Sequence, residues 1–78
     1  MDSVYLIINE ATFVDYEGLM QEIVGPVYKN YQGALDGLQE IARQANLNVK
    51  PDATIINLPV EGTHMESDEY YIIEMEIV

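Results

Sequence analysis

The sequence predicts an α+β fold, in which one helix packs on one face of a mostly antiparallel sheet of about four strands, in the order ββαββ. Three observations support this prediction. The chain has 78 residues, enough for a single domain spanning 1–78. Four short segments are rich in β-branched and aromatic residues, which favour strands. Between the second and third of them, a longer segment repeats its apolar residues with the period of an α-helix.

The first two strands are predicted at residues 4–9 and 22–28. Val4 to Asn9 is apolar at nearly every position, which is typical of a strand buried on both faces, so we expect it near the centre of the sheet. Pro26 has no N–H to donate to a neighbouring strand, which puts the second strand at a sheet edge or at a bulge. Residues 11–20 show no clean period, and we expect a loop or a short helical turn there.

A helix is predicted from Tyr31 to Ala45, with Asn30 as the N-cap residue. Its apolar residues recur at intervals of three and four and form one stripe: Tyr31, Ala34, Leu35, Leu38, Ile41, Ala42 and Ala45. Gly37 falls among the polar residues on the opposite side. The segment 46–52, which contains Pro51, ends the helix and forms a connection.

The last two strands are predicted at residues 53–58 and 70–78, with a polar turn region between them. The final strand alternates, so that one face carries Tyr71, Ile73, Met75 and Ile77 and the other carries Tyr70, Ile72, Glu74 and Glu76. We place the first of these faces beneath the helix. The expected core is therefore Leu6, Ile8, Leu35, Leu38, Ile41, Ile73, Met75 and Ile77.

One helix can cover only one face of such a sheet. The other face is then expected to carry Tyr5, Ile7, Tyr70 and Ile72, which are large apolar groups to leave in water. Residues 11–20, with Phe13, are one way to cover them. A homodimer that packs sheet to sheet or edge to edge is the other, and we favour it because a small chain without cysteine has no disulfide to supplement its core.

Acidic residues dominate the charge of the chain. Asp and Glu number 14 against 3 Lys and Arg, which gives a formal net charge of −11. This exceeds the magnitude of about 2–8 that keeps small domains soluble, and its self-repulsion opposes the compact state. The imbalance indicates a basic protein as partner. It excludes direct contact with nucleic acid, whose phosphates would repel the chain.

Nothing at the N-terminus resembles a secretory signal, and no apolar run approaches the roughly 20 residues that span a bilayer. We therefore expect a soluble cytoplasmic protein without membrane contact.

Catalysis and metal binding find little support in the sequence. His64 is the single histidine, and Ser3 and Ser67 are the only serines, so no oriented nucleophile and base can be identified. The segment around His64 is rich in carboxylates, but its spacing does not match a calcium-binding loop: Glu61, His64, Glu66, Asp68 and Glu69. We expect a solvated loop there, no metal, no cofactor and no enzyme activity.

The candidate binding site is a row of acids near the C-terminal end. Glu74 and Glu76 are two residues apart on a strand, so their side chains share a face about 7 Å apart. Together with the acids of the preceding loop they imitate the charge of a nucleic acid, and a neighbouring tyrosine supplies an apolar anchor. The expected partner-binding residues are Glu66, Asp68, Glu69, Tyr70, Glu74 and Glu76. The alternative is a structural or assembly protein that homo-oligomerises through an apolar sheet face.

Two segments carry a resemblance to a known group of proteins. Gly25 to Leu38, G-P-V-Y-K-N-Y-Q-G-A-L-D-G-L, and Tyr70 to Glu76, Y-Y-I-I-E-M-E, resemble small acidic phage early proteins, in which a V-x-x-x-Y-x-x-A-x-x-x-L stretch precedes a tyrosine-rich acidic strand. The matching residues are Val27, Tyr31, Ala34 and Leu38. The resemblance spans about half of the chain. It implies phage origin and a non-enzymatic role against a host or defence protein, in the cytoplasm of an infected bacterium.

Overall fold

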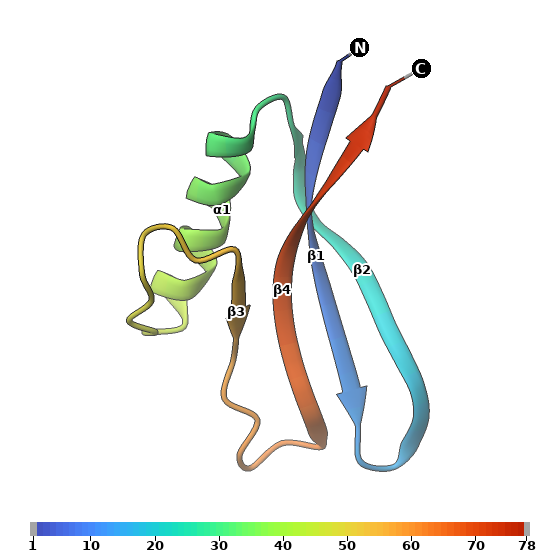
Figure 1. Ribbon diagram of the computed structural model, residues 1–78. Coiled ribbons are helices and arrows are strands. Elements are labelled where there is room, and N and C mark those ends of the chain that lie inside the picture. The colour runs from blue at the N-terminus through green and yellow to red at the C-terminus, as the bar shows by residue number, and fades with distance from the viewer. Residues whose placement is uncertain (1, 78) are drawn as a thin grey trace.

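The computed structural model describes residues 2–77, which form an α+β fold (Figure 1). The elements follow in the order β1 (Ser3–Phe13), β2 (Tyr16–Tyr28), α1 (Tyr31–Gln44), β3 (Ile55–Asn57) and β4 (Met65–Glu76). The strands form one antiparallel sheet in the order β2-β1-β4-β3. The predicted fold class and element order are confirmed. No helix within residues 2–77 is long and apolar enough to cross a membrane.

β1 lies in the interior of the sheet, as predicted, because it pairs with β2 on one side and with β4 on the other. β2 lies at an edge, which confirms the prediction from Pro26. The register between β1 and β2 also shifts between Tyr5 and Ile7, opposite the segment that contains Gly25 and Pro26. Gly25 has a φ of 76°, a conformation that residues with a Cβ atom rarely adopt. β2 is therefore both an edge strand and a bulged strand.

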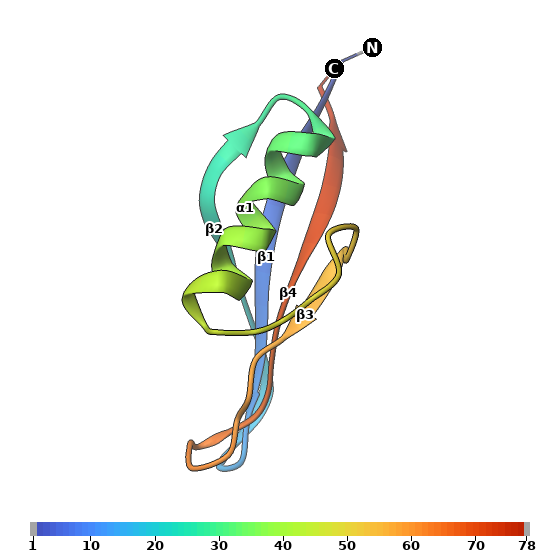
Figure 2. The same cartoon turned by 90° about the vertical axis from the view of Figure 1, so that its left-hand side faces the viewer.

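The prediction of a loop or helical turn at residues 11–20 is wrong. β1 continues to Phe13, a short turn follows, and β2 begins at Tyr16, so this segment is a β-hairpin. It extends beyond the C-terminal end of α1 instead of folding back over a sheet face (Figure 2). Most of β2 is exposed on both faces, and no buried face imposes the alternation by which strands are recognised in sequences. The hairpin therefore covers neither face of the sheet.

β3 and β4 do not have the predicted bounds. β4 begins at Met65 and takes in much of the predicted polar turn region. β3 is reduced to Ile55–Asn57, which pair with Tyr71, Tyr70 and Glu69 of β4.

The helix prediction is confirmed to within one residue. The Asn30 side chain accepts a hydrogen bond from the Gly33 N–H at 2.8 Å, which is the expected N-cap arrangement. The predicted stripe supplies the buried residues Ala34, Leu35, Leu38 and Ala42. Gly37, however, faces the sheet and not the solvent. A Cβ atom there would collide with the Tyr28 hydroxyl group, so glycine permits the close approach of α1 to β2.

The helix covers the sheet face opposite to the predicted one. Leu6 is buried as predicted, with 5% of its surface exposed. The cluster of buried residues beneath the helix consists of Ile7, Leu38, Ala42 and Ile56, and Tyr70 and Ile72 pack against it. Ile7, Tyr70 and Ile72 were predicted to lie on the uncovered face. Ile8, Ile73 and Met75 lie on the opposite face, and Met75 and Ile77 are 49% and 52% exposed. Both faces of β1 and β4 are apolar, so alternation alone does not identify the face that the helix covers.

Candidate interaction surfaces

The predicted acidic row is divided by the sheet. Asp68 and Glu74 share the helix-side face of β4, but Tyr70 and Ile72 lie between them, at a separation of roughly 20 Å for six residues of strand. Glu69 lies on the opposite face, where it pairs with Glu10. The prediction of one continuous row is therefore wrong, because these acids belong to a strand with alternating faces and not to a loop.

The two ends of the predicted row also differ from each other. Glu74 and Glu76 share a face and are exposed, as predicted from their spacing. Glu66 lies at the register shift between β1 and β4, where the alternation is interrupted. The structure therefore brings Glu74 and Glu76 together but does not join them to the remaining predicted residues.

Tyr70 is not a free apolar anchor, because its side chain packs against the core beneath α1. Its remaining accessible part contributes to a groove of about 230 Å³ on the helix-side face, beyond the end of the helix. Phe13, Met20 and Met65 form the apolar part of this groove, and Glu22 and Asp68 the acidic part. The Asn9 amide donates to Asp68 Oδ1 at 2.7 Å. Burial, together with the charges of Asp68 and Glu22, raises the pKa of Tyr70.

The sheet face opposite the helix is apolar over about half of its length and has no covering layer in residues 2–77 (Figures 1 and 2). Cross-strand pairs place its apolar side chains together, because paired residues share a face. We call this surface the bare face. Its apolar residues are Val4, Leu6, Ile8, Leu19, Ile23, Ile55, Tyr71, Ile73 and Met75, of which only Leu6 is buried.

Polar residues adjoin the apolar part of the bare face at Glu10. Glu10 Oε1 accepts hydrogen bonds from Gln21 Nε2 at 2.6 Å and from the Tyr71 hydroxyl group at 3.0 Å. Glu69 pairs with Glu10 from β4, so two carboxylates lie side by side on neighbouring strands. The hydrogen bond to Glu10, aided by burial and by the negative charge of Glu10, raises the pKa of Tyr71. Sequence analysis missed this cluster, although Glu10 is two residues from Ile8 and shares its face.

Positive charge is confined to the segment between β2 and β3. Lys29 precedes α1, Arg43 lies in its last turn and Lys50 follows it. Arg43 forms an ion pair with Glu40. The strands contain neither Lys nor Arg, but carry eight carboxylates: Glu10, Glu17, Glu22, Glu66, Asp68, Glu69, Glu74 and Glu76. The strands β1, β2 and β4 therefore carry acidic side chains and no basic ones, whereas β3 carries neither.

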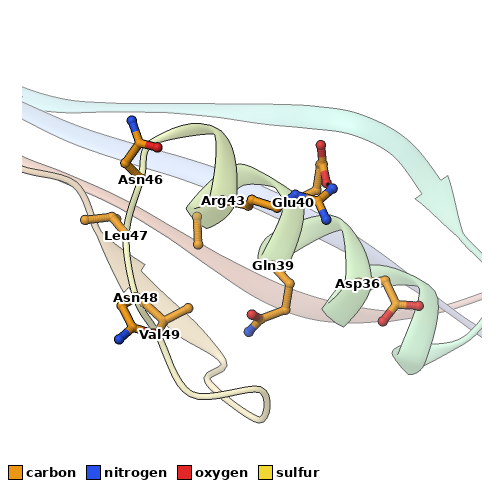
Figure 3. Close-up of a pocket in the computed structure, with 9 residues that line it drawn as sticks. Asp36, Gln39, Glu40, Arg43, Asn46, Leu47, Asn48 and Val49 are labelled. Atoms are coloured by element: carbon orange, nitrogen blue, oxygen red, sulfur yellow. Dashed lines mark ion pairs between the residues drawn. The ribbon is translucent and has the colours of Figure 1, made fainter.

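Another hollow lies at the C-terminal end of α1 and the loop that follows. Figure 3 shows its side chains, among them Gln39, Glu40 and Asn46, pointing in different directions, so their polar groups do not converge on one point. In the part of the chain that the structure describes, no three His, Cys, Asp or Glu side chains are grouped to hold a metal ion. No polar or charged residue of that part is fully buried either.

Comparison with protein-family models, with curated proteins and with solved structures finds no match for this chain. The resemblance to phage early proteins therefore stays an expectation from the sequence.

Proposed function

We propose that this protein is a non-enzymatic inhibitor that binds a basic, nucleic-acid-binding surface of a host or defence protein in the bacterial cytoplasm. One observation carries the proposal: the four strands hold eight carboxylates and neither Lys nor Arg. A surface of one sign attracts a partner of the opposite sign and speeds the encounter. Nucleic-acid-binding proteins have such a surface of opposite sign, because they bind the phosphates with Lys and Arg side chains.

Occupation of that surface would exclude nucleic acid by competition for the same basic side chains. The acids lie on both faces of the sheet. The whole molecule measures 42 Å in its longest direction and 16 Å in its shortest. A partner can therefore meet negative charge on either side of β4.

The test begins with capture of partners from a nuclease-treated bacterial lysate on the immobilised protein. A supporting result is a captured nucleic-acid-binding protein that, once purified, loses DNA or RNA in a gel-shift assay as this protein is added. Association should slow as salt rises, because the Debye length is only about 8 Å at physiological ionic strength. A captured protein that keeps its nucleic acid at saturating inhibitor would contradict the proposal.

Two variants with the same charge separate specific recognition from net charge. The first neutralises the predicted site: Glu66→Gln, Asp68→Asn, Glu69→Gln, Glu74→Gln and Glu76→Gln. The control neutralises five exposed acids outside the strands: Asp2→Asn, Asp15→Asn, Asp36→Asn, Asp52→Asn and Glu61→Gln. Each variant removes five of the eleven excess negative charges. We expect slower association and a flatter salt dependence for the first variant than for the control. Equal behaviour would show that only the total charge matters.

Homo-oligomerisation is the second candidate function, and the bare face is the observation that favours it. An uncovered apolar sheet face can pack against its copy, as in structural and assembly proteins. Sedimentation at micromolar concentration tests this, because a dimer has twice the mass of 8.8 kDa. A chain that sediments as a monomer over the whole concentration range would rule it out.

A further inference from the structure

The bare face leaves large apolar side chains in water. Ile23, Ile55 and Met75 are 60%, 54% and 49% exposed, and they come from three different strands. A hollow of about 410 Å³ lies among Ile8, Ile23, Tyr71 and Ile73. Contiguous apolar surfaces of this kind mark binding sites in soluble proteins.

The dimensions of the bare face suit a single α-helix. Neighbouring strands lie about 4.8 Å apart, so β2, β1 and β4 together span roughly 10 Å, close to the 10–12 Å diameter of a helix. The stretch from Val4 to Ile8 measures about 13 Å, or more than two helical turns. α1 already packs in this manner on the opposite face, over Ile7 and Ile72. A second helix would complete a helix–sheet–helix arrangement of layers.

The negative charge on the bare face indicates that such a helix carries a basic residue. Glu10 and Glu69 lie beside the apolar residues, and two hydrogen bonds fix the Glu10 carboxylate in place. A Lys or Arg at the end of an apolar stripe would reach both carboxylates while its aliphatic stem covers Ile8 or Tyr71. The strands supply no positive charge of their own to neutralise them.

We infer that the bare face binds an amphipathic helix of the partner protein, with an apolar stripe on Ile8, Ile23 and Ile73 and a Lys or Arg against Glu10 and Glu69. The inference rests on the proposed function and names the contact through which the basic partner is held. A second copy of this chain fits less well. It would bring a further net charge of −11 and no basic strand residue to face Glu10 and Glu69.

The test uses a synthetic leucine–lysine peptide with leucine at positions i, i+3, i+4 and i+7, and a scrambled peptide of the same composition. Isothermal titration gives the dissociation constants, and amide chemical shifts of the labelled protein locate the contact. We expect the striped peptide to bind at least about tenfold more tightly, because only it buries a continuous apolar face. The largest shifts are expected at Ile8, Ile23 and Ile73.

Matched variants test the apolar part and the charged part of the contact separately. Ile23→Thr with Met75→Thr should weaken the striped peptide about tenfold or more, since two apolar side chains leave the interface. Val14→Thr with Met20→Thr is the control: these residues are 60% and 55% exposed but lie outside the bare face. Glu10→Gln with Glu69→Gln should weaken binding and flatten its salt dependence, compared with Asp36→Asn with Asp52→Asn.

The outcomes separate this inference from the proposed function. If both peptides bind equally and the shifts follow the acids over the whole sheet, recognition is by charge alone: the inference fails and the proposed function stands. If neither peptide binds at low salt, both fail. A parent dimer that Ile23→Thr with Met75→Thr converts to a monomer would also overturn the inference, because a second copy would then occupy the bare face.

Discussion

Replacing Ile7 and Ile8 by alanine, one at a time, tests which sheet face the helix covers. Ile7 is 1% exposed and belongs to the core with Leu38 and Ile56, so the shorter side chain leaves a cavity. Three carbon atoms at about 0.8 kcal/mol each give roughly 2.4 kcal/mol, and the cavity raises the loss to about 3–4 kcal/mol. Ile8 lies half-buried on the bare face, where solvent fills the space. Its replacement is expected to cost about 1 kcal/mol.

Urea unfolding followed by circular dichroism measures both losses. A chain of this length has a free energy of unfolding of about 4–12 kcal/mol, so the Ile7→Ala loss is a large share of it. With a urea dependence of about 1 kcal/mol/M, the midpoint should fall by roughly 3 M for Ile7→Ala and by roughly 1 M for Ile8→Ala. Low protein concentration keeps self-association from contributing. Equal losses, or a larger loss for Ile8→Ala, would refute the assignment of the covered face.

Three further predictions concern single contacts. Gly37→Ala should lower the free energy of unfolding by about 1 kcal/mol, because overpacking against Tyr28 and Ile7 outweighs the helix propensity gained. The melting temperature should recover in part when Tyr28→Phe removes the hydroxyl group, whose oxygen is the nearest atom to the added methyl group. Asn30→Ala should cost about 1 kcal/mol by calorimetry, and Asn30→Ser, which also caps helices, should restore most of it. Because the pKa of Tyr71 is raised, the folded state holds the hydroxyl proton of Tyr71 more tightly than the unfolded state does. The stability that this difference contributes is fully present below pH 10, the ordinary pKa of tyrosine, and is lost as the pH rises through the higher pKa of the folded state. Glu10→Gln should lower the pKa seen in tyrosinate absorbance; an unchanged titration would exclude the hydrogen bond as its cause.

The sequence identifies the elements that local chemistry determines. The Asn30 cap and the apolar stripe of α1 are properties of consecutive residues, and Pro26 limits its strand to an edge or a bulge whatever else surrounds it. The covered face is different. Ile7 and Ile8 are chemically the same residue on opposite sides of β1, and only long-range packing distinguishes them.

The errors in the candidate site have related causes. The acids of β4 are adjacent in sequence, but a strand directs neighbours to opposite faces, so Asp68 and Glu69 separate once the segment is known to be a strand. The pairing of Glu10 with Glu69 joins residues from opposite ends of the chain, which no local pattern reveals. Gly37 was misplaced because glycine has no hydropathy of its own to show a buried position.

The place of β4 in the sheet determines when this fold can form during synthesis. β4 follows the other elements in sequence, yet it lies between β1 and β3, and it is the strand with which β3 pairs. Until β4 has left the ribosome, the nascent chain has only the β1–β2 hairpin and the helix that packs on it, and the inner edge of β1 is unpaired. Ser3 must then find Glu76 across nearly the whole chain. Such distant pairing slows folding and leaves the sheet incomplete until β4 has been synthesised.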